Sequence, residues 1–206
     1  MRNGNGRTIK TRYSTSNRTD KFEEPINSIY WIMKDESLPS VIKVSESVLA
    51  ATFGATLATK RLIAERLKKG IDVNKLVIEP YANPFRIYPL EEDYNHFKAL
   101  FTDQNIDCYI INTGYFVNKK ITPAITLNSI ESIVKGTAEF KPFGTINDLS
   151  YLVVEGYEPN FDSQDYRQLI QERLQMRVVY IQEQKAENKL NVLPDEALEA
   201  MQALIE

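Results

Sequence analysis

The chain has 206 residues and carries 25 Lys and Arg against 28 Asp and Glu, a formal net charge of −3. Hydrophobic residues make up 43% and charged residues 26%, a composition typical of a soluble globular protein with a sizeable core. One cysteine and one histidine exclude an internal disulfide framework and multi-cysteine or histidine-cluster metal sites, and the near-neutral charge argues against general nucleic-acid binding.

The first half of the chain alternates predicted strands with a long predicted helix. Alternating residues predict a strand over 7–13, and the almost continuous apolar run at 28–33 predicts a strand covered on both faces. A helix is expected over residues 45–69, with Gly54 as a possible break. Residues 75–79 predict another strand, and three prolines then hold the chain in extended and turn conformations.

The second half continues the alternation. Apolar residues at helical spacing predict a helix over about 90–104, and the apolar run 107–112 predicts a strand. Thr122 and Pro123 predict the start of the next helix, because a hydroxyl caps it and proline suits its first position. A strand is expected within 147–154, and two helices fill the last fifty residues. Strands that feed helices in this way predict an α/β fold.

The most informative segment runs from residue 112 to residue 123, Asn-Thr-Gly-Tyr-Phe-Val-Asn-Lys-Lys-Ile-Thr-Pro. A strand ends, a loop with two lysines follows, and a capped helix begins. Ligands in open α/β sheets bind beyond the carboxyl ends of strands, and a helix N-terminus favours anions. The segment therefore suits a nucleotide or phosphate site. The alternative is a solvated connection whose charges serve solubility. The sequence has no phosphate-binding loop of the type Gly-x-x-x-x-Gly-Lys-Ser/Thr.

This segment resembles the C-terminal part of ATP-dependent phosphoenolpyruvate carboxykinases. Residues 107–115, Asp-Cys-Tyr-Ile-Ile-Asn-Thr-Gly-Tyr, are similar to the family's strand ending in Val-Asn-Thr-Gly-Trp. Residues 119–122, Lys-Lys-Ile-Thr, resemble its Gly-Lys-Arg-Ile-Ser. The match depends on the order and spacing of several short pieces rather than on one motif.

Three further pieces resemble the same family. Residues 79–85, Glu-Pro-Tyr-Ala-Asn-Pro-Phe, are a compressed form of its Glu-Pro-x-Phe-Ser-Ala-Cys-Phe-Gly-Ala-Pro-Phe. Residues 11–14, Thr-Arg-Tyr-Ser, are similar to its Thr-Arg-Val-Ser-Tyr, and residues 27–32 to its Asn-Ile-Ile-Phe-Leu strand. The resemblance spans about residues 7 to 185 in the right order.

The resemblance implies roles for four residues. Arg12 stands where the family's arginine contacts the nucleotide phosphates and the phosphoenolpyruvate side, a task that suits a planar guanidinium. Lys120, Ile121 and Thr126 stand where the family holds the adenosine of ATP. Ile121 would pack on the base, while the amine and the hydroxyl would bind ribose or phosphate.

The chain also departs from the family pattern. Residues 115–118 replace its glycine-rich stretch, Lys120 replaces an arginine, and Leu127 stands at the position of another arginine. The family's phosphate-binding loop and its metal-binding Lys, His and Asp lie upstream of the Thr-Arg match, and this chain has no counterpart of them.

These observations predict the C-terminal portion of a divergent carboxykinase-like protein, either a fragment or a natural truncation. The expected fold is α/β, a carboxykinase C-terminal-like mixed sheet flanked by helices, with a nucleotide-binding portion at 1–160 and a helical extension at 161–206. The cofactor would be ATP, with Mg²⁺ and Mn²⁺ only in a complete enzyme, and the chain itself holds no metal site.

The expected partner is the missing N-terminal portion with the phosphate-binding loop, or another subunit that supplies it. The chain alone is expected to be inactive, in a cytoplasmic location, with neither nucleic acid nor membrane as a partner. No apolar run approaches the roughly 20 residues of a membrane span, and the polar N-terminus is unlike a secretory signal. The alternative is an inactive module that binds adenine nucleotide or another protein.

Overall fold

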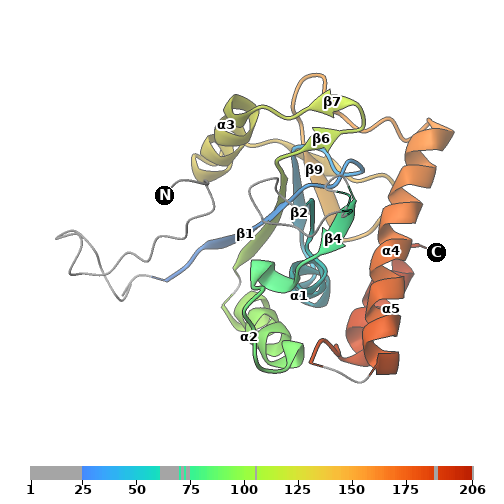
Figure 1. The fold of residues 1–206 in the computed structure, drawn as a ribbon. Helices are drawn as coiled ribbons and strands as arrows, with labels where there is room; N and C mark the ends of the chain where they lie inside the picture. Colours follow the sequence, from blue (N-terminus) through green and yellow to red (C-terminus); the bar gives the residue numbers. More distant parts are fainter. Residues whose placement is uncertain are drawn as a thin grey trace, which may run out of the picture.

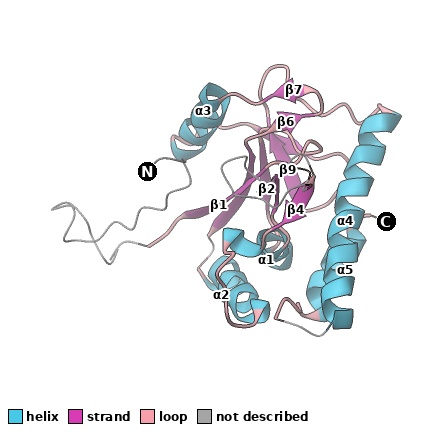
Figure 2. Cartoon of the chain, viewed as in Figure 1, coloured by secondary structure: helices cyan, strands magenta, loops and turns pink. Residues whose placement is uncertain are grey.

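The computed structural model describes residues 25–60, 70, 72, 75–104, 106–187 and 190–205. The strand predicted at 7–13, and Arg12 with it, lies outside these residues. The chain has a mixed α/β architecture, in which a five-stranded sheet carries helices on both faces (Figures 1 and 2). The expected α/β class and mixed sheet are confirmed.

The main sheet combines one parallel pair of strands with antiparallel neighbours. Its order is β1 (Ser28–Met33), β5 (Asp107–Asn112), β2 (Val41–Val44), β9 (Leu149–Leu152) and β8 (Phe140–Pro142). Only β1 and β5 run parallel, in a register that places Ser28 opposite Asp107 and Met33 opposite Asn112. The strands predicted at 28–33, 107–112 and within 147–154 are confirmed.

Two small antiparallel pairs accompany the main sheet. One joins β3 (Ala58–Lys60) to β4 (Leu76–Ile78), and the other joins β6 (Tyr115–Phe116) to β7 (Lys119–Lys120). The 3₁₀ turn η1 (Pro80–Ala82) follows β4.

The helix predicted over 45–69 is wrong for residues 56–60, and its part at 61–69 lies outside the described residues. Helix α1 is Ser47–Ala55, and the Glu46 carboxylate caps it by accepting from the N–H groups of Val48 and Leu49 at 2.8 and 2.7 Å. The chain then becomes extended, because the Leu57 and Ala58 carbonyls accept from distant N–H groups, those of Glu79 and Lys34. These partners come from elsewhere in the fold, so helical spacing alone could not reveal them.

Gly54 lies inside α1 and does not break it. A Cβ at this position would approach a ring carbon of Tyr81 to 2.5 Å and one of Trp31 to 2.8 Å. The absence of a side chain therefore lets two aromatic rings pack directly on the helix. Tyr81 also donates a hydrogen bond from its hydroxyl to the Ala51 carbonyl at 2.8 Å.

The other helices agree closely with the predicted ones. Helix α2 is Leu90–Asp103, α3 is Pro123–Val134, α4 is Gln164–Glu187 and α5 is Asp195–Ala203. Thr122 caps α3 as expected, since its hydroxyl accepts from the Ile125 N–H at 3.4 Å. No helix in the described part of the chain is long and apolar enough to cross a membrane.

The two faces of the sheet bury different clusters. The larger cluster lies between one face and helices α1, α2, α4 and α5, and includes Trp31, Met33 and Ile110 from the sheet. The smaller cluster lies between the other face and α3, around Tyr109 and Ile111. Helices α4 and α5 pack into the same core as α1 and the strands, so both helices are part of the main packing unit.

Candidate functional site

The carboxyl ends of the two parallel strands meet at one end of the sheet. Two connections leave from there, residues 34–40 after β1 and residues 113–122 after β5, and we call them the strand-end loops. The second loop contains the β6–β7 hairpin and leads into α3 (Figure 1). This is the end of an open α/β sheet where ligands bind.

Asn112, the last residue of β5, joins the two strand-end loops. Its side-chain nitrogen lies 2.8, 2.6 and 2.8 Å from the carbonyl oxygens of Asp35, Leu38 and Tyr115. Its side-chain oxygen accepts from the Gly114 N–H at 2.9 Å. One fully buried amide therefore satisfies backbone groups in both loops and fixes their relative position.

A buried ion pair joins the first strand-end loop to helix α4. Asp35 is 0% exposed and follows β1, while Arg177 is 1% exposed and belongs to α4. The arginine Nη2 donates to the carboxylate at 2.8 Å, and the N–H and hydroxyl of Ser37 donate to it at 3.1 and 2.7 Å. A charged carboxylate can be buried because all these donors surround it.

The pKa of Asp35 reflects two opposing effects. Burial favours the neutral acid and by itself would raise the pKa, but the charge of Arg177 and the hydrogen bonds from Arg177 and Ser37 outweigh it. The net pKa lies below the ordinary value of 3.8, so the carboxylate is charged at neutral pH.

Helix α4 touches the same loop a second time through Tyr166. Its hydroxyl donates to the Ser37 carbonyl at 2.8 Å, and burial raises its pKa, so the hydroxyl keeps its proton. We call Asp35, Asn112, Tyr166 and Arg177 the buried polar frame. These four side chains hold the strand-end loops against the sheet and α4.

The structure describes three of the four residues that the resemblance assigns to the nucleotide. Lys120 is exposed at the end of β7, and Thr126 is half-buried in the first turn of α3, where its hydroxyl donates to the Thr122 carbonyl at 3.4 Å. Ile121 is 3% exposed and belongs to the main core. These three lie together in one loop and helix start. Arg12 is outside the described residues.

Ile121 is buried because it closes the hairpin. Its N–H donates to the Gly114 carbonyl at 3.0 Å, and the Tyr157 hydroxyl donates to the neighbouring Lys120 carbonyl at 2.8 Å. Little of the Ile121 side chain is left for a ligand. Its role as a base contact stays a prediction.

Several cations lie around the strand-end loops. Lys119 donates to the Gly156 carbonyl at 3.0 Å and its amine lies 4.2 Å from the centre of the Tyr157 ring. Lys60 pairs with Glu36 at 2.8 Å, whereas the described residues show no ion pair to Lys34 or Lys120. Pro123 has no N–H, and the N–H groups of Ile125 and Thr126 donate to Thr122, so the start of α3 attracts an anion mainly through its dipole. The amines of Lys34 and Lys120 and this positive helix end together suit an anionic group such as phosphate.

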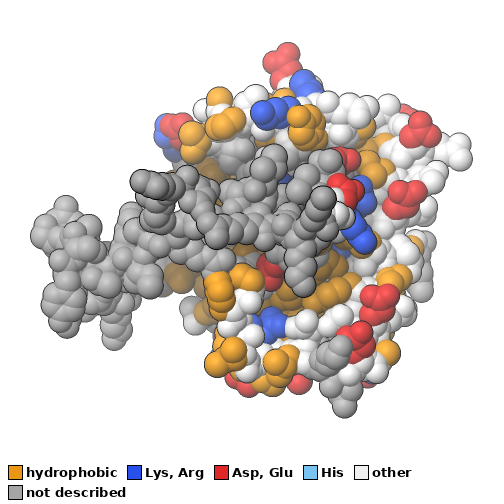
Figure 3. Space-filling view, in the orientation of Figure 1, with side chains coloured by type: hydrophobic (Ala, Val, Ile, Leu, Met, Phe, Trp, Pro, Cys, Tyr) orange, Lys and Arg blue, Asp and Glu red, His pale blue; other side chains and the backbone are white. Residues whose placement is uncertain are grey.

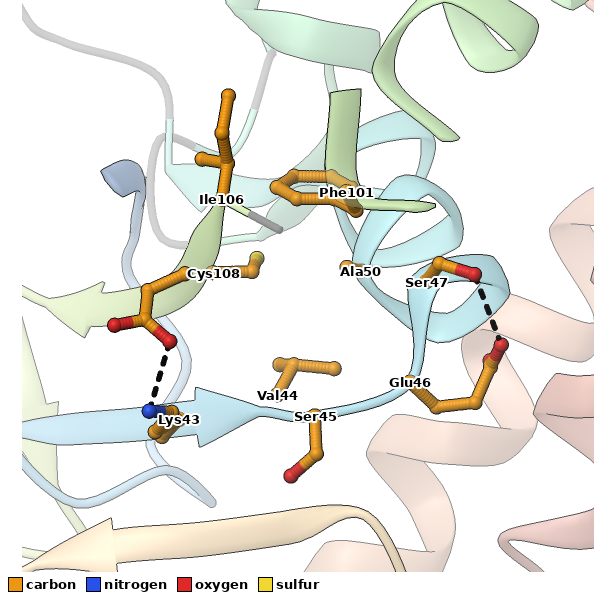
Figure 4. Close-up of a pocket in the computed structure, with 10 residues that line it drawn as sticks. Lys43, Val44, Ser45, Glu46, Ser47, Ala50, Phe101, Ile106 and Cys108 are labelled. Atoms are coloured by element: carbon orange, nitrogen blue, oxygen red, sulfur yellow. Dashed lines mark hydrogen bonds and ion pairs between the residues drawn. The ribbon is translucent and has the colours of Figure 1, made fainter. Parts of the chain in front are cut away.

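Two hollows among the described residues fit an anion less well than this loop, and neither is lined by Lys120 or Thr126. One, of about 500 Å³, lies between Val117 and the first turns of α4, and its rim carries the carboxylates of Asp165 and Glu172. The other, of about 290 Å³, lies at the opposite end of the sheet, between β2, β5 and the start of α1 (Figure 4). There the Lys43 amine pairs with Asp107 at 2.8 Å, which leaves it largely neutralised.

Cys108 lines the second hollow, and burial raises the pKa of its thiol, so the group stays protonated and unreactive. With 1% exposure, Cys108 is a small residue of the core. Across the described residues no group of three His, Cys, Asp or Glu side chains converges on a possible metal position.

Sequence reasoning missed the ion pair of the buried polar frame. Asp35 and Arg177 are 142 positions apart, so no local pattern connects them. One signal was available: Arg177 falls on the apolar stripe of α4, among Leu174, Val178 and Ile181. A charged residue on a buried stripe requires a buried partner, and an acid directly after a buried strand is a natural candidate.

Comparison with known proteins gives no family assignment. No protein-family model matches the chain, and a search of curated proteins found no match.

Proposed function

We propose that this chain is the C-terminal portion of a carboxykinase-like protein and supplies adenosine and phosphate contacts to a shared nucleotide site. The supporting observation is the placement of Lys120, exposed at the end of β7, next to the capped N-terminus of α3 and Thr126. The Lys120 amine can donate to ribose or phosphate oxygens, and the positive end of the α3 dipole favours a phosphate.

The complete protein would convert oxaloacetate and ATP to phosphoenolpyruvate, ADP and carbon dioxide. Such phosphoryl transfer needs divalent cations to neutralise the phosphates, and Mg²⁺ and Mn²⁺ would serve here. The described residues lack a metal-binding cluster of His, Cys, Asp or Glu. The proposal assigns the metal ligands and the phosphate-binding loop to another portion of the protein or to a partner subunit, as the resemblance implies.

Calorimetric titration of the purified chain with ATP tests the nucleotide contacts. The proposal expects saturable binding that Lys120→Ala weakens about ten-fold, about 1.4 kcal/mol, because an amine contact to the nucleotide is lost. Arg12→Ala is expected to weaken binding as well, since the resemblance places its guanidinium at the phosphates.

Lys141→Ala is the matched control. Lys141 lies on β8 and is also exposed, and its amine lies 4.0 Å from the Glu139 carboxylate, so the variant removes the same charge from a different surface. Absence of heat with the wild-type chain, or equal weakening by Lys120→Ala and Lys141→Ala, would remove the nucleotide role.

An assay for phosphoenolpyruvate formation separates the enzyme portion from an inactive binding module. The chain alone is expected to have no turnover and to gain it when the portion with the phosphate-binding loop is added. Turnover by the chain alone contradicts the division of the site between two portions. Nucleotide binding without turnover in the reconstituted mixture would favour the inactive module.

A further inference from the structure

The two edges of the main sheet are built differently. Strand β8 forms one edge; it has three residues, Phe-Lys-Pro, and its lysine and proline are devices that discourage further pairing. Strand β1 forms the other edge, with six residues, Ser-Ile-Tyr-Trp-Ile-Met, and neither charge nor proline. Within the described part of the chain, only β5 pairs with β1. A long, uncharged, apolar edge is a template for another strand.

The backbone groups that point away from β5 can be identified. The Asn27 and Met33 carbonyls accept from the N–H groups of Asp107 and Thr113. The backbone N–H and C=O groups of odd-numbered residues in β1 therefore point toward β5. Even-numbered residues therefore face outward, because backbone groups alternate along a strand. The Lys34 N–H agrees with this, as it points outward to the Ala58 carbonyl at 3.0 Å. The free edge thus consists of Ser28, Tyr30 and Ile32.

These three residues are self-complementary. When two copies of β1 run antiparallel with Tyr30 opposite Tyr30, Ser28 of each copy faces Ile32 of the other. Every outward N–H and C=O from 28 to 32 then finds a partner, as a hydrogen-bonded antiparallel pair requires. The arrangement has two-fold symmetry and closes, and no like charges face each other across it.

The side chains on this edge point to the same conclusion. Ile32 is 59% exposed and Ile26, just before the strand, is 58% exposed. The Tyr30 hydroxyl is buried but has no hydrogen-bond partner among the described residues, and its ring stacks on Tyr109 at 5.1 Å. In the two-fold pairing, the Tyr30 side chains of both copies lie on the same face beside the axis.

We propose that this chain forms a two-fold homodimer in which β1 pairs antiparallel with β1 of a second copy, with Tyr30 at the axis. The dimer extends the five-stranded sheet across both copies. Because β1 pairs through its edge and the nucleotide contacts lie beyond its end, this proposal does not depend on the proposed function.

Analytical ultracentrifugation of the full chain over a concentration series tests the dimer. Ile32→Lys is expected to raise the dissociation constant at least ten-fold, because it places a charge in the pairing edge. The substituted side chain is exposed, so the fold should persist, and circular dichroism checks it. The matched control is Ile87→Lys, at a position that is 88% exposed in the connection before α2. Figure 3, in the orientation of Figure 1, shows hydrophobic side chains gathered in the lower part of the visible face.

A rescue variant tests the register itself. Since Ser28 faces Ile32 of the other copy, Ser28→Glu combined with Ile32→Lys places opposite charges directly across the pair. The double variant should return the dissociation constant to within about three-fold of the wild type, since such a pair is favourable. Within one copy the two positions are four residues apart along a strand, too far for direct contact.

Three results would overturn the proposal. The first is a monomer at every concentration, which would indicate that a different chain covers β1. The second is a dimer that Ile32→Lys leaves unchanged or that Ile87→Lys disrupts equally. The third is a double variant no tighter than Ile32→Lys alone, which excludes the register with Tyr30 at the axis.

Discussion

Two ion pairs with the same 2.8 Å separation lie at opposite ends of the sheet. Arg177 and Asp35 meet below the strand-end loops with side chains 1% and 0% exposed. Lys43 and Asp107 meet beside the other hollow with side chains 34% and 48% exposed. Water screens the second pair but not the first, so the electrostatic interaction between the two charges is stronger in the buried pair at the same separation. Burial, rather than distance, identifies the pair that organises its surroundings.

The largest expected effect comes from breaking the buried pair. Arg177→Met leaves the Asp35 carboxylate buried without its cation and should lower the free energy of unfolding by about 3–5 kcal/mol. Urea unfolding followed by circular dichroism measures it. Arg173→Met is the control, because Arg173 lies 3.8 Å from Asp35 and should contribute less. The double variant Asp35→Asn, Arg177→Met should recover part of the loss. If Arg177→Met alone lowers the free energy of unfolding by less than about 0.5 kcal/mol, the buried pair does not stabilise the strand-end loops as described.

A smaller effect should appear on acidification. The folded pKa of Asp35 lies below its ordinary value of 3.8, so its contribution is complete above that value and disappears as pH falls through the folded pKa. The wild type should therefore lose stability in this acid range more steeply than Asp35→Asn, with a constant difference near neutral pH. Unfolding curves of both proteins from pH 7 to about pH 3 measure this. Parallel curves across the acid range would show that Asp35 does not carry the effect.

The smallest effect is expected at the exposed pair. Lys43→Ala should change the free energy of unfolding by less than about 1 kcal/mol, and added salt should shrink the difference further. The same urea titrations, repeated at low and high salt, provide the measurement. A loss as large as that of Arg177→Met would remove the contrast between the two ends of the sheet.

Elements with complete local signals could be predicted from the sequence. Helix α3 has its threonine cap, its proline and its apolar stripe within fifteen residues, and β5 is a single apolar run. Strands β2, β3 and β8 were not predicted, because they are three or four residues long and depend on partners far along the chain. The C-terminal end of α1 was misjudged for the same reason.

The candidate site likewise has features that the sequence predicts and features that it does not. The approach of Lys120 and Thr126 follows from their nearness in the sequence, so it could be expected without a structure. The buried polar frame could not, since it joins residues from β1, β5 and α4. The depth of Ile121 was also hidden, because Gly114 and Tyr157 supply the hydrogen bonds that close its surroundings.

Helix α4 has 24 residues and is therefore about 36 Å long, comparable to the width of a small domain. Tyr166 near its start and Arg177 near its middle both bind the loop after β1, while Ile181 packs in the core farther along. Sliding this rod by one turn would break two buried polar contacts at once. These contacts fix the position of α4 along its axis, and the length of α4 then sets the distance between the strand-end loops and the last turn of the helix at Glu187.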